Sequence, residues 1–206
     1  MTALVVPWRP TSPERVAAYE LTLAWYRHHL PDAQVVLADS GHDVWNLAAS
    51  RNVGVADAVE SGHRRIVITD ADTIPPPRGL ALALKGCRDG RLHYPFDRCL
   101  YAGTDGQPGR ANGGVFVVSA AGWAAIGGQD ERFTGWGGED DQLVAAATCL
   151  TGVVRHPGIA VSYWHPPVAG FGTARHAANL KLLARYTAAK GSSRHMRRLI
   201  AERATT

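Results

Sequence analysis

The sequence predicts an α/β fold in which the central sheet is mostly parallel. The first reason is that apolar, strand-like runs alternate with segments of helical periodicity along the chain. The second is that polar groups follow three of the expected strands: Pro7-Trp8-Arg9, Asp39 and Asp70-Ala71-Asp72. Ligands of such sheets bind beyond the carboxyl ends of the strands, so these groups predict one site at that edge.

The first half of the chain contains three expected strands and two helices. A strand over residues 3–8 precedes a helix over 13–30, for which Ser12 is the expected N-cap and Pro13 the first helical residue. A second strand over 33–39 leads to a helix over 46–60. The third strand, in "RRIVITDADTIPP", runs into carboxylates and is stopped by prolines.

The second half continues the alternation. We expect a strand over 114–119, helices over 120–128 and 139–150, a last strand over 158–164, and then C-terminal helices. From residue 181 onward there are seven basic residues and one acid, Glu202, within a chain of net charge +4. We therefore expect a main domain over 1–180 and a basic helical tail over 181–206.

Composition restricts the class of protein. Its length of 206 residues, with 46% hydrophobic and 19% charged residues, is typical of one globular domain. Cys87, Cys99 and Cys149 are widely spaced and form no CxxC pair, which argues against a disulfide framework or structural zinc. No apolar run approaches the ~20 residues of a membrane span. The first residues lack the basic region of a signal peptide, and we expect a cytoplasmic protein.

The basic residues are concentrated in the tail. A nucleic-acid-binding protein normally carries its basic stripe through the folded body, so we expect no nucleic-acid partner. The tail allows a peripheral contact with anionic lipid, although a solvated terminal helix is the commoner interpretation.

Asp70 and Asp72 lie two residues apart at the end of an expected strand. Side chains two apart in a strand point to the same face, so both carboxylates can reach one cation. Such hard oxygen ligands suit Mg²⁺ or Mn²⁺. The alternative is an ordinary strand-to-loop turn, where Asp is common.

The order of motifs resembles the GT-A glycosyltransferases, and most of all the catalytic domain of the β-1,4-galactosyltransferase family. Polypeptide N-acetylgalactosaminyltransferases and chondroitin-polymerase-type enzymes are similar. "GWGGEDD" (135–141) matches the most specific motif of the family almost letter for letter. Pro7-Trp8-Arg9 resembles a Pro-Phe-Arg that holds uridine nucleotide, "WNLAASRNVG" (45–54) a Phe-Asn-Arg-Ala segment, and Asn112-Gly113-Gly114-Val115 a Gly-Gly-Val strand.

The resemblance implies a single GT-A domain over residues 1–180 that transfers a sugar from a nucleotide-diphosphate donor, a UDP-sugar, to a saccharide or glycoconjugate. It implies Mn²⁺ or Mg²⁺ held by Asp70, Asp72 and His165, with His156 as the fallback ligand. The donor-binding residues that it implies are Pro7, Trp8, Arg9, Asp39, Arg51, Asp70, Ala71, Gly113 and Gly114.

Two positions depart from the family. The arginine of Phe-Asn-Arg is Leu47 here, so the phosphate contact is lost or taken over by Arg51. A methionine ligand three residues before the metal histidine is Ser162. For Arg9 the alternative is an ion pair with a surface acid, and for Asp39 a cap or turn. Trp45 is expected to be a core residue.

The chemistry of sugar transfer explains the rest of the GWGGEDD segment. Acids in the first turn of a helix complement its positive end, but that does not account for Trp136, Gly137 and Gly138. A pyranose can stack on Trp136, and the two glycines allow the backbone to approach it, so we expect these three to bind the acceptor. Asp140 is the expected base, which implies inversion of the anomeric centre. Glu139 is expected to hold sugar hydroxyls, and Asp141 to serve the helix start.

Two other classes remain open. A nucleotidyltransferase acting on sugar phosphates would also use paired aspartates and a metal, but "VVPWRPTSPERV" lacks a phosphate loop rich in glycine and lysine. A catalytically inactive sugar-binding GT-A module would keep Trp136 and the glycines, but would have no need of Asp70, Asp72, His165 and Asp140 together.

Overall fold

The computed structural model describes residues 1–103, 106–165 and 172–205. Its first half has the expected alternation: β1 (Thr2–Pro7), α1 (Pro13–His29), β2 (Gln34–Ala38), α2 (Leu47–Glu60) and β3 (Arg65–Thr69). The hydroxyl of Ser12 accepts from the backbone N–H of Arg15 at 3.4 Å, which confirms the expected cap of α1. These elements agree with the prediction to within one or two residues.

The second half has more elements than the sequence predicts. The expected ones are β7 (Val115–Ser119), α4 (Ala120–Ile126), α5 (Glu139–Leu150), β9 (Ile159–Ser162), α6 (Ala174–Ala189) and α7 (Ser193–Ala201). The sequence interpretation missed α3 (Pro77–Gly86), β5 (Leu92–Tyr94), β6 (Arg98–Tyr101) and β8 (Val153–Arg155), and the short β4 (Thr73–Ile74), η1 (Cys87–Asp89) and η2 (Glu202–Thr205). Strands of two to four residues are too short to show a clear alternation of polar and apolar side chains.

A six-stranded sheet with the order β2-β1-β3-β7-β5-β8 forms the centre of the molecule. The pairs β1–β2, β1–β3 and β5–β8 are parallel, whereas β7 is antiparallel to both of its neighbours. The expected mostly parallel sheet is therefore confirmed, with one reversed strand inside it. A smaller sheet with the order β4-β9-β6 lies beside the end of β3.

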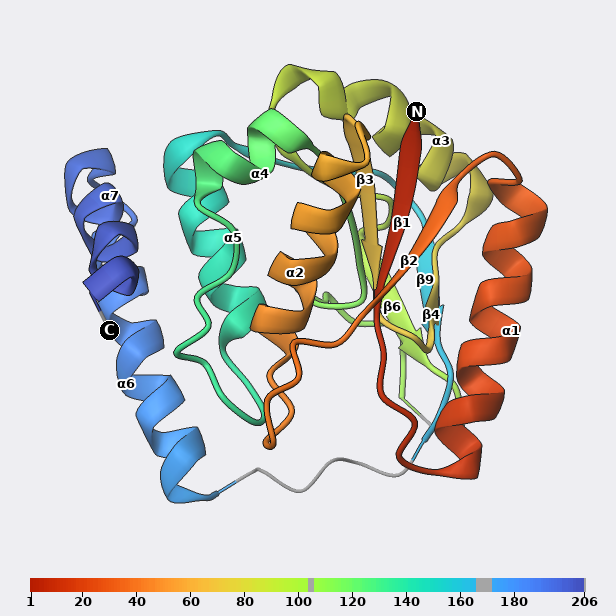
Figure 1. Ribbon diagram of the computed structural model, residues 1–206, viewed down its shortest axis with the longest axis horizontal. Helices are drawn as coiled ribbons and strands as arrows, with labels where there is room; N and C mark the ends of the chain where they lie inside the picture. Colours follow the sequence, from red (N-terminus) through yellow and green to blue (C-terminus); the bar gives the residue numbers. More distant parts are fainter. Residues whose placement is uncertain (104–105, 166–171, 206) are drawn as a thin grey trace.

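Helices cover both faces of the central sheet. Figure 1 shows α1 on one side of the strands and α2, α4 and α5 on the other. Between these layers β1, β3 and β7 are almost completely buried, and their runs of Val, Ile, Leu and Phe form the middle of the core. Strands covered on both faces have few polar positions, which explains why these three were recognisable as continuous apolar runs.

The C-terminal segment packs on the rest of the domain. Helix α6 runs through residue 181 without a break, so the expected boundary between domain and tail falls inside a helix. Tyr186, Met196 and Leu199 are buried, and the hydroxyl of Tyr186 donates to Asp130 at 2.8 Å. Arg203 donates to the carbonyl of Gly127 at 2.7 Å. Among the described residues, none of these helices has the length and apolar character that crossing a bilayer requires.

Candidate active site

A cleft of about 1060 Å³ opens where β1 and β3 end. Most of the predicted site residues line it, and they come from segments far apart in the sequence: Pro7, Asp70, Ala71, Asp72, Gly113, Gly114, Trp136, Gly137, Gly138, Glu139, Asp140 and His165. The structure therefore brings together the strand-end aspartates, the Gly-Gly strand start and the GWGGEDD segment. We call this hollow the central cleft.

Asp70 is fixed at the end of β3 by backbone and side-chain bonds. Its N–H donates to the carbonyl of Gly114 at 2.7 Å, and its Oδ2 accepts from the N–H of Gly114 at 3.1 Å. Burial raises the pKa of Asp70 to about 6; Arg51 opposes this shift, while Asp140 and Asp72 add to it. Several carboxylates are thus held close together, which is a repulsive arrangement that a cation relieves.

Asp72 and His165 meet across the cleft. Nε2 of His165 and Oδ2 of Asp72 lie 2.8 Å apart, and Nδ1 of the same imidazole is 3.5 Å from Arg15. The loop after β9 and the loop after β3 therefore bring together two of the three predicted metal ligands. Asp70 instead turns its Oδ1 towards Arg51, and within the described residues no ready-made cluster of three metal-binding groups is found.

Arg51 lies beneath the cleft and not in its lining. Its side chain is 0% exposed, and its guanidinium donates to Asp70 at 2.5 Å and to Asp140 at 2.6 Å. Nη1 also donates to Gln129 at 3.2 Å, and the group lies 5.0 Å from the ring centroid of Phe116. A phosphate contact was expected of Arg51, but both of its terminal nitrogens are bound to carboxylates of the site.

Asp140 and Glu139 begin α5 and differ in their surroundings. Oδ1 of Asp140 accepts from Arg51 and from Gln129 at 3.4 Å, while Oδ2 faces Gly113 closely enough that a Cβ there would collide with it. Glu139 is 9% exposed, and its Oε2 has no hydrogen-bond partner among the described residues. Burial raises the pKa of Glu139 to about 7, and the negative charge of Asp140 adds to this shift.

The glycines before α5 have backbone conformations that only glycine adopts easily. Gly137 and Gly138 have φ angles of 96° and 102°, and Gly138 is the N-cap of the helix. The role expected for them was close approach to a sugar. The structure adds a second reason, because they make the turn that places Trp136 and the acids on one wall of the cleft.

Asn179 of α6 holds this turn from behind. It is 2% exposed, and its Nδ2 donates to the carbonyls of Thr134, Trp136 and Gly137 at 3.1, 3.2 and 2.9 Å. No sequence motif marked Asn179. The only available signal was a polar residue within the apolar positions of a helix, which is a weak one.

Asn112 and Arg155 form a second support that the sequence did not reveal. Nδ2 of Asn112 donates to Asp141 at 2.6 Å, and Nη2 of Arg155 donates to Oδ1 of Asn112 at 2.6 Å. The guanidinium of Arg155 lies 4.1 Å from the ring centroid of Tyr94. Asp141 lies in the first turn of α5, as expected, and through Asn112 it also ties that turn to the segment before β7.

Besides Arg51, three of the expected donor-binding residues, Trp8, Arg9 and Asp39, lie outside the lining of the cleft. Arg9 forms a two-armed bond with Asp39 at 2.7 and 2.6 Å, and Trp8 stacks on Tyr19 with ring centroids 4.4 Å apart. This is the surface ion pair that we gave as the alternative for Arg9. Trp45, for which a core position was expected, instead lines the cleft beneath the guanidinium of Arg9.

Exposed aromatic rings collect in the cleft. Among the described residues the exposed Trp, Tyr and Phe side chains are Tyr101, Trp136 and Trp164, which are 55%, 49% and 53% exposed. All three line the cleft. Large apolar rings left in water favour a ligand with flat apolar faces, which is a property of pyranose rings.

Comparison with solved structures identifies the fold. The chain superposes on Drosophila β-1,4-galactosyltransferase 7 bound to xylobiose with a TM-score of 0.60 and 18% identity, covering 87% of this chain and 79% of that one. The fold is GT-A. A mutant of the same Drosophila enzyme with manganese, UDP-Gal and xylobiose gives a TM-score of 0.61 and 17% identity, covering 86% and 78%.

A third GT-A structure is similar over a longer part of this chain. GalNAc-T7 with UDP, GalNAc and Mn²⁺ gives a TM-score of 0.57 and 10% identity, covering 98% of this chain and 54% of that one. The chain therefore spans about half of that protein. The family model described as "N-terminal domain of galactosyltransferase" matches residues 106–167, which include the Gly-Gly strand start and the GWGGEDD segment of this GT-A domain. A search of curated proteins gives no significant match.

Proposed function

We propose that this GT-A domain is a metal-dependent glycosyltransferase that moves a sugar from a UDP-sugar to a hydroxyl of a saccharide or glycoconjugate. The observation that carries the proposal is the meeting of Asp70, Asp72, His165 and Asp140 in one cleft beside Trp136. The similar Drosophila enzyme was crystallised with manganese, UDP-Gal and xylobiose, which supports both the donor class and the acceptor class.

Asp72, His165 and Asp70 are the residues that would hold a divalent ion such as Mn²⁺. Two carboxylates and an imidazole are a ligand set that suits this ion, and the Asp72–His165 pair already has its ligand atoms facing each other. When bound, the ion neutralises the negative charge that develops on the departing diphosphate. Asp70 would have to turn one oxygen from Arg51 towards the ion.

Asp140 is the proposed base. Its Oδ1 is held by Arg51 and Gln129, so Oδ2 is the oxygen that can take the proton of the acceptor hydroxyl. The acceptor oxygen forms its bond to the anomeric carbon as the bond from that carbon to the diphosphate oxygen breaks, and the nucleoside diphosphate leaves with the electron pair. A single displacement of this kind inverts the anomeric centre.

Glu139 and Trp136 are the proposed acceptor contacts. With its pKa raised to about 7, the Glu139 carboxyl is partly protonated near neutral pH and can donate a hydrogen bond to a sugar hydroxyl as well as accept one. Trp136 offers an exposed indole face beside it. The glycines between them leave the backbone accessible to the same sugar.

The test is nucleotide release from a panel of UDP-, GDP- and CDP-sugars, each with and without Mn²⁺. We expect turnover of a UDP-sugar that needs the ion, and a loss of at least a hundredfold in Asp72→Ala and Asp140→Asn. Asp57→Asn, an exposed position on α2, is the matched control and keeps full activity. Turnover that is unchanged in Asp140→Asn would exclude Asp140 as the base.

Three further readouts separate the remaining interpretations. The anomeric configuration of the product, followed by NMR, is opposite to that of the donor in an inverting reaction. Release of pyrophosphate from a nucleoside triphosphate and a sugar phosphate would indicate a nucleotidyltransferase. UDP binding without turnover in the presence of several saccharides would indicate an inactive module.

A further inference from the structure

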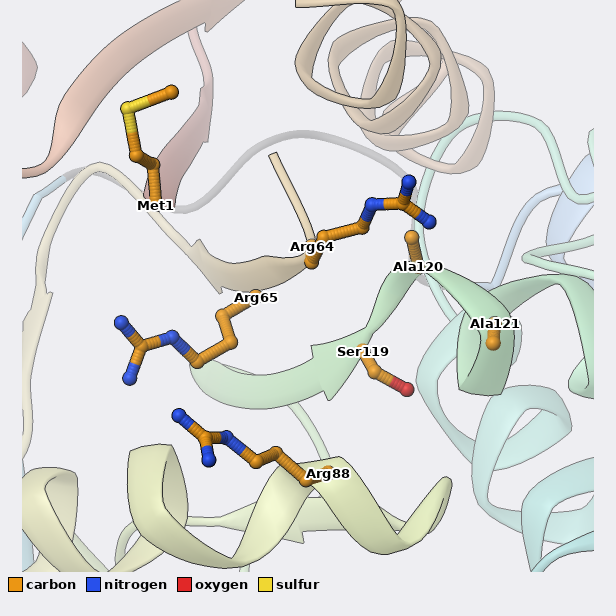
Figure 2. Close-up of a pocket in the computed structure, with 7 residues that line it drawn as sticks. All are labelled: Met1, Arg64, Arg65, Arg88, Ser119, Ala120 and Ala121. Atoms are coloured by element: carbon orange, nitrogen blue, oxygen red, sulfur yellow. The ribbon is translucent and has the colours of Figure 1, made fainter. Parts of the chain in front are cut away.

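A second cavity, of about 410 Å³, lies at the opposite end of the central sheet. Figure 2 shows the residues that line it: Met1, Arg64, Arg65, Arg88, Ser119, Ala120 and Ala121. Arg65 is the first residue of β3, whereas Asp70 follows the last residue of the same strand. The cavity is therefore separated from the central cleft by the length of a buried strand.

The charge of this cavity is strongly one-sided. Three arginines line it, and no acidic residue does. Within the described part of the chain, none of the three guanidinium groups has a hydrogen bond or an ion pair. The nearest acid in sequence, Asp89, is engaged elsewhere: it pairs with Arg91 at 2.7 Å and with His93 at 3.1 Å.

Arg65 and Arg88 act on the same region although they belong to different elements. Burial raises the pKa of the Cys87 thiol and the charge of Asp89 adds to this shift, while the charges of Arg65 and Arg88 both oppose it. Figure 2 shows these two side chains extending in the same direction, while Arg64 extends the opposite way, towards Ala120. Two positively charged side chains therefore extend to the same side of the cavity.

The floor of the cavity is firmly packed. The N–H of Ala120 donates to the carbonyl of Arg64 at 3.0 Å, which joins the start of α4 to the start of β3. A Cβ on Gly122 would lie 2.7 Å from the carbonyl oxygen of Gly90, so α4 and the turn after η1 are in close contact. The Ser119 oxygen accepts from the N–H of Gly122 at 3.0 Å, which leaves its proton available to the cavity.

We propose that this arginine cavity binds a small phosphate-bearing anion. Arginine presents a planar set of donors that matches phosphate oxygens, and two such groups on a packed floor can hold one anion from two sides. A concave surface of one charge sign also raises the local concentration of counter-ions. The volume accommodates a diphosphate group, and the position makes this site independent of the sugar-transfer chemistry.

The primary test is calorimetric titration with pyrophosphate in the absence of divalent cations, when the carboxylates of the central cleft repel anions. We expect saturable binding to the wild-type chain, and binding at least tenfold weaker in the double variant Arg65→Gln/Arg88→Gln. The matched control is Arg27→Gln/Arg78→Gln, which removes the same charge from exposed positions on α1 and α3. Its affinity should stay within twofold of wild type.

A variant of the central cleft, Arg110→Gln/Arg175→Gln, decides which site the anion occupies, because it removes two cations that line the cleft. It should bind pyrophosphate like the wild type; a loss of binding there would place the anion in the cleft and overturn the proposal. Equal weakening in the control pair would overturn it too. If the Arg65 variant does not fold, the exposed Arg88→Gln is measured alone and should weaken binding at least threefold.

The phosphate can belong to a soluble compound or to a lipid headgroup. Co-sedimentation with phosphatidylcholine vesicles, with and without phosphatidylglycerol, distinguishes these sources. Binding that requires phosphatidylglycerol and is lost in Arg65→Gln/Arg88→Gln supports a headgroup. Pyrophosphate binding without vesicle binding supports a soluble ligand, and the absence of both overturns the proposal.

Discussion

Arg51 and Asp140 are joined by a 2.6 Å ion pair in which the guanidinium is 0% exposed, and the same guanidinium binds Asp70. One buried cation therefore connects the proposed base with the first aspartate of the DADTIP segment. A planar donor group that reaches both carboxylates fixes their separation as well as their charge. Such a link explains how two acids from α5 and the end of β3 are kept in position.

Removal of the Arg51 charge should destabilise the fold. Arg51→Met leaves Asp70 and Asp140 without their common partner, and we expect the free energy of unfolding to fall by about 2–4 kcal/mol. Urea denaturation measures the change. Arg9→Met is the matched control, because Arg9 pairs with Asp39 at a solvent-screened surface site, and we expect a much smaller loss there. Equal losses of unfolding free energy in the two variants would contradict the role of Arg51 in positioning Asp70 and Asp140.

Gly113→Ala should impair activity and leave the fold intact. The new Cβ would collide with Oδ2 of Asp140, the oxygen proposed to accept the proton, so the carboxylate has to move. We expect a fall in kcat of at least tenfold and a melting temperature close to that of the wild type. Gly109→Ala is the control, since a Cβ there meets nothing within 4 Å. Full activity in Gly113→Ala would show that the position of Asp140 is not critical.

Asn179→Asp tests the support of the Trp136 turn. The substitution keeps the shape of the side chain but places an oxygen where Nδ2 donates to three carbonyls. Buried acceptors left without a donor cost about 1–3 kcal/mol, and repulsion adds to this loss. We expect a lower free energy of unfolding and a higher KM for the acceptor, with the KM for the donor little changed. An unchanged KM for the acceptor would show that Asn179 does not position the residues that bind the acceptor.

Glu139 should make stability depend on pH in one defined window. In the folded chain its pKa is raised from 4.5 to about 7, so between these values the folded state keeps a proton that the unfolded state has lost. The free energy of unfolding therefore falls as pH rises through this window, by up to about 3 kcal/mol from this group. Glu139→Gln removes this contribution, whereas the exposed Glu60→Gln should leave the wild-type profile unchanged. Parallel profiles for wild type and Glu139→Gln would contradict the raised pKa.

The long elements and the main motif were predictable because their signals are local. Strands β1, β3 and β7 are apolar runs that a sheet covered on both faces requires, and Ser12 followed by Pro13 marks the start of α1. The GWGGEDD segment combines a turn that needs glycine with acids that suit a helix start, so its conformation is encoded within seven consecutive residues. Placing Asp70 and Asp72 at the carboxyl end of β3 followed from the same local pattern.

The partners of the site residues depend on contacts between distant segments, which a local pattern does not contain. Arg51 could be recognised as a helical arginine, but its two carboxylates lie 19 and 89 residues away in the chain. Asn179 reaches the Trp136 turn across more than 40 residues, and Arg9 pairs with Asp39 outside the cleft. Residue types and spacing establish the chemistry that is present. Packing of the helices on the sheet establishes which charges meet, because burial makes an unpaired charge costly and selects its partner.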